Sequence, residues 1–178
     1  MIFLDTETTG LLSATVNELE NQPRITEIAM VKTTDDLDFV DQMETLIDPQ
    51  TLINDQVSKI TGITSDMVKG KPTFPEIYMD VANFFVGETT VVAHNCSFDM
   101  GMLWVELARM EREFHFPWPI NWICTVEKSY HISRCRLKLR DLHYNAAGSF
   151  HDEKAHRAME DVYALIRCFK WMKKENMV

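Results

Sequence analysis

The sequence predicts an α/β fold in which a mixed β-sheet is flanked by helices, and two observations lead to this prediction. Three strand-like stretches come first, and the later strand-like stretches alternate with helical ones, as in folds that cover a sheet with helices. The chain has 178 residues, 46% of them hydrophobic, which is enough to bury the core of one ordinary domain. We therefore expect a single domain over residues 1–178.

The predicted strands are apolar stretches bounded by polar or turn-forming residues. The first begins with Ile2-Phe3-Leu4, and the second is the partly alternating stretch ITEIAMV. The third stops at Asp48-Pro49, because proline cannot continue a hydrogen-bonded ladder. The polar residues 8–24 form a loop in this interpretation. The predicted strands are residues 2–6, 25–31, 39–47, 89–93 and 122–124.

The predicted helices carry apolar residues at intervals of three or four, which places these residues on one side of a helix. Ile77, Val81 and Phe84 follow this spacing in one helix. The last helix carries a broad apolar stripe from Ala158 to Met172. The predicted helices are residues 54–60, 74–86, 97–113, 126–131, 137–145 and 156–174.

Composition excludes several classes of protein. There is no run of 18 or more apolar residues, so we expect no membrane span, and the N-terminus lacks a signal-peptide pattern. The four cysteines are scattered without a CxxC pair, which favours reduced thiols in a cytoplasmic protein. The net charge of −9 argues against a basic DNA-binding surface, but acids bound to divalent cations would change that balance.

The stretch DTETTG places two carboxylates, Asp5 and Glu7, at the end of the first predicted strand. Side chains two residues apart in a strand point to the same face, so these two acids are expected to lie side by side. A strand that simply ends in a polar turn would have a similar composition. The six residues alone leave both interpretations open.

A second stretch, VVAHNCSFDMGML, runs from a short apolar strand into a helix. Asp99 stands in the first turn of this helix, between the apolar Phe98 and Met102. An acid at this position also complements the helix dipole, which is a purely structural explanation. His94 taken alone is more often a hydrogen-bonded structural residue than a catalytic one.

A third stretch, HDEKAHRAMEDVYAL, contains His156 and Asp161. Residues at i and i+5 lie about 140° apart on an ideal helix, so both cannot point at one site from the middle of a helix. We expect Asp161 to face inward from the helix and His156 to lie at its N-terminal end or on the preceding loop. A solvated, charged helix start is the structural alternative.

These three stretches together resemble a known family. Asp-x-Glu-x-x-Gly, His-Asn-x-x-Phe-Asp and His-x4-Asp are similar, in order and spacing, to the three motifs of the DnaQ-like DEDDh 3′–5′ exonucleases. The resemblance extends over residues 2–165, and the stretches ITEIA and ITGIT are also similar to family sequences. Among the members, the chain looks most like exonuclease X and the proofreading subunit of bacterial polymerase III, and WICT adds to the likeness to exonuclease X.

The resemblance implies an RNase H-like fold with a mixed five-stranded sheet, and a site that binds two divalent metal ions, Mg²⁺ or Mn²⁺. All-oxygen ligands favour such hard cations over zinc, and cations would relieve the repulsion within the cluster. Asp5 is expected to bridge both ions, Glu7 and Asp161 to hold the ion with the attacking water, and Asp99 to act through water. His156 is the expected general base.

Further residues are expected to contact the terminal nucleotide. Leu11, with Leu12, is expected to wedge against the last base, although anchoring of the loop in the core explains it equally well. The basic cluster RCRLKLR, residues 134–140, either holds the phosphate backbone or forms a solvated helix face. The predicted substrate-binding residues are Thr6, Thr8, Leu11, His94 and Phe98.

The predicted function is that of a 3′–5′ exodeoxyribonuclease that acts on single-stranded DNA or DNA 3′ ends and releases nucleoside 5′-monophosphates. The alternatives are an exoribonuclease of the same fold, which would act on RNA, and a catalytically silent interaction module. The chain ends soon after its last helix, so we expect no long C-terminal extension for a polymerase, and no polymerase partner is assigned.

Overall fold

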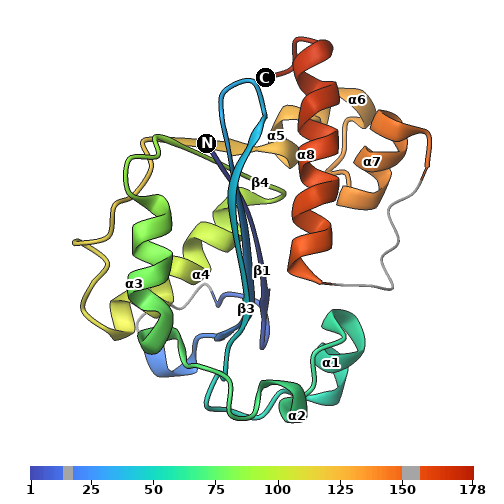
Figure 1. The fold of residues 1–178 in the computed structure, drawn as a ribbon. Helices are drawn as coiled ribbons and strands as arrows, with labels where there is room; N and C mark the ends of the chain where they lie inside the picture. Colours follow the sequence, from blue (N-terminus) through green and yellow to red (C-terminus); the bar gives the residue numbers. More distant parts are fainter. Residues whose placement is uncertain (14–17, 150–156) are drawn as a thin grey trace.

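The structure is a computed structural model that describes residues 1–13, 18–149 and 157–178. Its centre is a five-stranded sheet with the strand order β3-β2-β1-β4-β5, so the first strand of the chain lies in the middle (Figure 1). The strands are β1 (Ile2–Thr8), β2 (Ile25–Thr33), β3 (Phe39–Leu46), β4 (Thr90–Ala93) and β5 (Asn121–Cys124).

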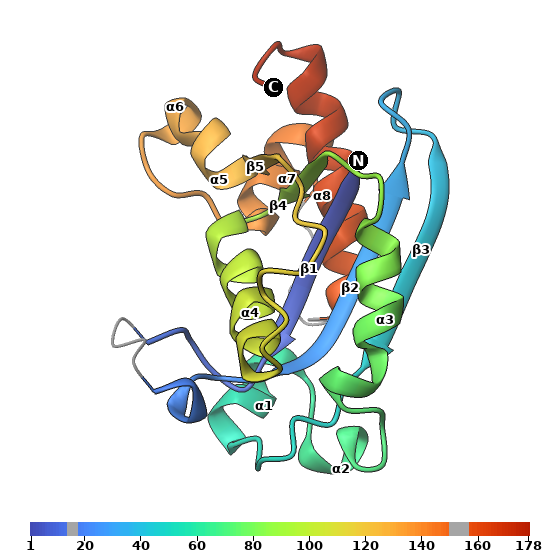
Figure 2. The same cartoon turned by 90° about the vertical axis from the view of Figure 1, so that its left-hand side faces the viewer.

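Helices cover both faces of this sheet. α3 (Phe74–Phe85) and α4 (Cys96–Arg109) lie on one face, and α8 (Ala158–Lys174) lies on the other (Figures 1 and 2). The strands β1, β2 and β3 pair antiparallel, whereas β1–β4 and β4–β5 are parallel. The predicted mixed five-stranded sheet flanked by helices is confirmed. The other helices are η1 (Leu19–Asn21), α1 (Asp55–Thr61), α2 (Ser65–Val68), α5 (Thr125–Lys128), α6 (Tyr130–Ser133) and α7 (Leu139–Ala147).

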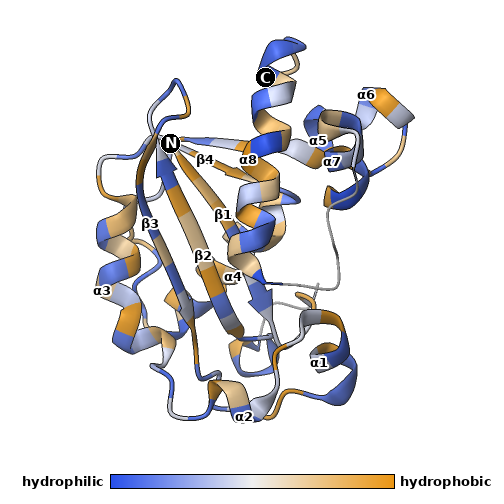
Figure 3. Cartoon of the chain, turned by 45° about the vertical axis from the view of Figure 1, so that its right-hand side comes forward, coloured by the Kyte–Doolittle hydropathy of each residue, from blue (hydrophilic) through white to orange (hydrophobic). Residues whose placement is uncertain are grey.

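The central strand β1 alternates between two cores. Ile2 and Leu4 are buried in the core that α3 and α4 cover, whereas Phe3 is buried in the core under α8. The rings of Phe3 and Phe169 lie 5.3 Å apart in an edge-to-face arrangement. The hydropathy colouring of Figure 3 shows apolar residues along the central strands and a more polar β3 at the sheet edge. By the same alternation, Asp5 and Glu7 follow Phe3 on the α8 side.

The bounds of the predicted helices differ from the observed ones, and three of these differences concern the end of α4, the division between α5 and α6, and the start of α8. The helix predicted to run to residue 113 ends at Arg109, and Glu111 adopts a left-handed conformation with φ of 57°. Residues 126–131 are divided between α5 and α6 at the buried Ser129. The last helix begins at Ala158, and residue 156 lies outside the described residues. Helix ends depend on local capping that apolar spacing does not encode.

Two expectations about the chain as a whole can be compared with the structure. In the described ranges, no helix is both long enough and apolar enough to cross a membrane. All four cysteines, which fall within these ranges, are free, and three of them are buried. The cysteines therefore form no disulfide framework in this fold.

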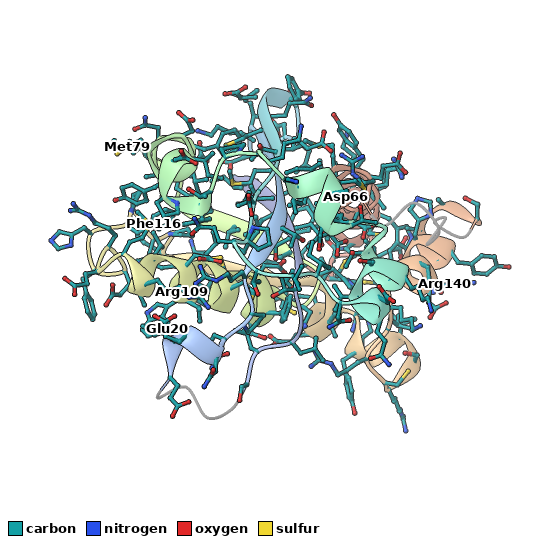
Figure 4. All side chains as sticks on the ribbon, turned by 90° about the horizontal axis from the view of Figure 1, so that it is seen from below. Glu20, Asp66, Met79, Arg109, Phe116 and Arg140 are labelled. Atoms are coloured by element: carbon teal, nitrogen blue, oxygen red, sulfur yellow. The ribbon has the colours of Figure 1, made fainter. Side chains whose placement is uncertain are left out.

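A buried ion pair on α4 holds the segment that precedes β2. Arg109 lies 3.0 Å from Glu106, and the Glu106 carboxylate also accepts a hydrogen bond from the backbone N–H of Ile25. The guanidinium of Arg109 donates to the carbonyl groups of Leu19, Gln22 and Pro23. Seen from below, Arg109 lies beside the segment that carries Glu20 (Figure 4). This pair fixes the path by which the chain returns from β1 to β2.

We predict that Arg109→Met lowers the free energy of unfolding by about 3 kcal/mol, because it leaves the Glu106 carboxylate buried without its partner. Urea denaturation followed by circular dichroism measures this change. Arg112→Met, which removes an exposed arginine just beyond the same helix, is the control and should change the free energy by under about 0.5 kcal/mol. Equal effects of the two substitutions would contradict the role of the buried pair.

Candidate active site

Three carboxylates from distant parts of the chain meet beside the central strand. Asp5, Glu7 and Asp161 each place a carboxylate oxygen within 4.8 Å of the others. Asp5 and Glu7 project from β1, and Asp161 projects from the first turn of α8. The expectations that Asp5 and Glu7 share one face and that Asp161 faces inward agree with this geometry. We call these three residues the acidic cluster.

Asp99 approaches the acidic cluster from the opposite face of β1. It is buried in the first turn of α4, and one of its carboxylate oxygens accepts two hydrogen bonds from Thr6. The backbone N–H of Thr6 donates over 3.0 Å and the hydroxyl over 2.8 Å. Thr6 therefore holds Asp99 next to β1, a role that the sequence did not reveal. Contact between Thr6 and a nucleotide stays a prediction.

Burial and mutual repulsion make these carboxylates hard to ionise. Burial, followed by the charges of the neighbouring acids, raises the pKa of Asp5 well above its ordinary value. The same causes raise the pKa of Glu7 to about 8. Burial also raises the pKa of Asp99 to about 7, although its hydrogen bonds from Thr6 act in the opposite direction. Bound cations would remove the cost of ionising such a cluster.

The donor set fits hard divalent cations. Each member of the acidic cluster offers a carboxylate oxygen, and the described residues place no cysteine or histidine among these three ligand groups. Oxygen-only sites favour Mg²⁺ or Mn²⁺ over softer metals. Asp99 lies outside the group of three but is close enough for its charge to raise the pKa of Asp5. This placement suits the predicted indirect role of Asp99.

Glu27 is a second buried acid beside the acidic cluster, in addition to Asp99, and none of the three sequence motifs includes it. It stands opposite Glu7 in the β1–β2 ladder and is 0% exposed. Its carboxylate binds Arg157 and the backbone N–H of Ala158, at the start of α8. The signal in the sequence was one acid within the otherwise apolar stretch ITEIAMV.

His94 lies under the basic cluster rather than within the acidic one. One ring nitrogen is 2.9 Å from the hydroxyl of Thr125, and the other is 3.0 Å from the carbonyl oxygen of Leu137. Burial lowers the pKa of His94 to about 4, so the ring is neutral. The side chain of the next residue, Asn95, accepts a hydrogen bond of 2.6 Å from Arg136. These contacts tie the basic cluster to the start of α4, and a phosphate contact by His94 stays a prediction.

The remaining residues predicted to contact substrate differ in their exposure to solvent. Leu11 is 83% exposed, and it lines a cavity of about 320 Å³ together with Leu52 and Arg24. Thr8 is buried, and its hydroxyl donates to the carbonyl oxygen of Gly10. Phe98 is half-buried and packs against the core beside α4. Contacts between these three side chains and substrate stay predictions.

The predicted general base, His156, lies outside the described residues. The next residue, Arg157, is described, and it forms the cap of α8. Asp161 is one turn into this helix, as expected. The assignment of His156 therefore continues to depend on the motif.

Comparison with known proteins agrees with this geometry. The model of the exonuclease family RNase_T matches residues 2–169. The chain belongs to this family. The family covers nearly the whole chain, including every member of the acidic cluster, Asp99 and His156. The domain is thus of the DnaQ-like, DEDDh type, as the resemblance implied.

The curated relatives include DNA polymerase III subunits. The chain is 33% identical to the epsilon subunit of Treponema pallidum over 169 residues, which are 94% of this chain and 74% of that protein. It is 31% identical over 179 residues to a PolC-type DNA polymerase III of Clostridium perfringens. That match covers 98% of this chain but only 11% of the polymerase, and another PolC-type relative is matched over 6% of its length.

Solved structures share the fold. An exonuclease X in complex with 5′ overhanging duplex DNA is 26% identical, with a TM-score of 0.64 over 98% of this chain and 92% of that chain. The nuclease domain of 3′hExo, a DEDDh family member bound to rAMP, has a TM-score of 0.76 at 19% identity. The match covers 98% of this chain and 91% of that one. The predicted RNase H-like fold is confirmed.

We predict that the metal-free protein loses stability as the pH rises from 4.5 to about 8. In this range folded Glu7 retains a proton that the unfolded chain has already lost, so each increment of pH favours unfolding. Urea denaturation in EDTA measures the free energy of unfolding. Glu7→Gln, which cannot ionise, should show a shallower decline, and Mg²⁺ should reduce the decline of the wild type. A wild-type profile parallel to that of Glu7→Gln would contradict this prediction.

Proposed function

We propose that the protein is a metal-dependent 3′–5′ exodeoxyribonuclease that releases nucleoside 5′-monophosphates from DNA 3′ ends. The observation that carries the proposal is the acidic cluster, with Asp99 beside it, in a domain of an exonuclease family. The three clustered carboxylates come from β1 and α8, which are separated by 149 residues of sequence, 9–157. Such convergence of partly buried acids destabilises the folded protein unless bound cations balance the charge.

In the proposed mechanism, Asp5, Glu7 and Asp161 would hold two divalent ions, and Asp99 would act on them through water. When bound, these ions would lower the pKa of a water molecule and stabilise charge on the phosphate. His156 accepts the proton of the attacking water. The water oxygen forms a bond to the terminal phosphorus while the bond to the 3′-oxygen of the preceding nucleotide breaks. The products are a nucleoside 5′-monophosphate and a shortened strand whose 3′-oxygen takes up a proton from solvent to become a 3′-hydroxyl.

DNA is the proposed substrate because of the kinds of protein that the chain is similar to. The exonuclease X structure holds duplex DNA with a 5′ overhang, and its identity to this chain is 26%. By name, the epsilon relative is a subunit of DNA polymerase III, and the PolC-type relative is a DNA polymerase III. Leu11, exposed next to the acidic cluster's strand, is proposed to contact the last base. Arg136 and its basic neighbours are proposed to hold the phosphate backbone, which would offset the acidic net charge.

We predict stepwise release of mononucleotides from a 5′-labelled DNA oligonucleotide in Mg²⁺ or Mn²⁺, and none in EDTA. Asp5→Ala should abolish release, since it removes a carboxylate proposed to hold both ions. His156→Ala should lower the rate by about 10²–10⁴-fold, the range for loss of a general base. Gel electrophoresis of timed samples measures the rate.

Two exposed positions provide matched controls for this experiment, Asp80→Ala and His115→Ala, and both should retain the wild-type rate. A parallel RNA oligonucleotide separates the alternatives: faster digestion of RNA would overturn the DNA assignment in favour of an exoribonuclease. Absence of release from either strand would favour the silent interaction module. Robust digestion by Asp5→Ala would overturn the proposed mechanism.

A further inference from the structure

We infer that Glu27 and Arg157 form a positioning pair that sets the first turn of α8, and with it Asp161, against the acidic cluster. The inference rests on the proposed function, because it assigns these residues a part in building the same cation site. Neither residue is proposed as a metal ligand. They are proposed to act through Asp161.

The setting of Glu27 requires a partner. Its side chain is 0% exposed on β2, directly across from Glu7, on the α8 side of the sheet. A buried carboxylate without a partner is strongly destabilising. Another repelling charge next to the acidic cluster also makes the cluster harder to ionise, and Glu27 contributes to the raised pKa of Glu7. Burial of Glu27 therefore lowers the stability of the fold in a way that an alanine or leucine at the same position would not.

Both oxygens of Glu27 are engaged by the start of α8. One oxygen accepts a hydrogen bond of 2.9 Å from Nε of Arg157 and forms an ion pair with Nη2 of the same guanidinium at 2.8 Å. The other accepts a hydrogen bond of 3.0 Å from the backbone N–H of Ala158, the first residue of the helix. Arg157 occupies the N-cap position, and its side chain accepts no hydrogen bond from the helix. Glu27 on the sheet therefore provides the negatively charged acceptor for a backbone N–H that a capping side chain normally provides.

This contact reaches Asp161 through one turn of backbone. The carbonyl oxygen of Arg157 accepts the backbone N–H of Asp161 over 3.2 Å and that of Glu160 over 3.0 Å. Glu27 fixes Arg157 and Ala158 to β2, and Glu7 stands opposite Glu27 on β1. The position of the first turn of α8 is therefore fixed relative to Asp5 and Glu7 on β1. Loss of the Glu27–Arg157 pair would let Asp161 move relative to Asp5 and Glu7.

The loss of charge and the loss of positioning predict opposite effects of Arg157→Met on the affinity for cations. This substitution removes a positive charge near the acidic cluster, so electrostatics alone would leave cation binding unchanged or make it tighter. Loss of positioning would make cation binding weaker. We expect the affinity for Mn²⁺, measured by isothermal titration calorimetry and by electron paramagnetic resonance, to fall at least about 10-fold, as when supporting partners of metal ligands are removed.

A second variant covers the case in which Arg157→Met does not fold because Glu27 remains buried alone. Glu27→Met with Arg157→Met replaces the ion pair by apolar side chains, an exchange that proteins often tolerate, and leaves the net charge unchanged. It should fold, as thermal melting will show, and should also bind Mn²⁺ at least about 10-fold more weakly. Arg157→Lys should bind Mn²⁺ with an affinity between those of Arg157→Met and the wild type, because a lysine ammonium cannot place two nitrogen atoms against the Glu27 carboxylate as the guanidinium does.

Glu44→Gln is the matched control. Glu44 also binds the guanidinium of Arg157, at 3.2 Å, but it is exposed, and among the described residues it makes no hydrogen bond to the backbone N–H of Ala158 as Glu27 does. The affinity of the Glu44→Gln variant for Mn²⁺ should stay at the wild-type value. Folded variants of Glu27 and Arg157 that bind Mn²⁺ as the wild type does would overturn the positioning role while leaving the proposed function intact. A wild type that binds no Mn²⁺ would overturn both.

Discussion

Repulsion between carboxylates at the centre of the sheet is the constraint on which the rest of the structure depends. Asp5, Glu7 and Asp161 bring their oxygens within 4.8 Å of one another, and burial strengthens the repulsion because little water screens it. The raised pKa values of Asp5 and Glu7 express this cost. A fold that tolerates such a cluster must hold it rigidly, and the cluster is fully ionised at neutral pH only when cations share the site.

The fold meets this constraint by placing the acids on its central strand and on the first turns of two helices. The strand order places β1 in the middle of the sheet. The first turns of two helices lie beside it, that of α4 with Asp99 and that of α8 with Asp161. Helix N-termini favour negative charge, so both acids lie where the helix dipoles lower the cost of ionisation. Contacts from the sheet then hold each turn: Thr6 on β1 binds Asp99, and Glu27 on β2 binds the start of α8.

Sequence periodicity predicted the parts of the site that are local. The alternation of β1 was enough to place Asp5 and Glu7 on one face, and apolar spacing was enough to find the main helices. Convergence of Asp99 and Asp161 on that strand could be expected only from the family resemblance, because it depends on how α4 and α8 pack. The supporting contacts escaped prediction for the same reason: Thr6 and Asp99 are 93 residues apart, and Glu27 and Arg157 are 130 apart.

The central claim is that the acidic cluster exists to bind divalent cations, and anomalous diffraction from crystals grown with Mn²⁺ tests it most directly. The account predicts anomalous peaks within direct coordination distance of the oxygens of Asp5, Glu7 and Asp161, and their loss in crystals of Asp5→Asn. Saturating Mn²⁺ with no peak at these three carboxylates would contradict the account.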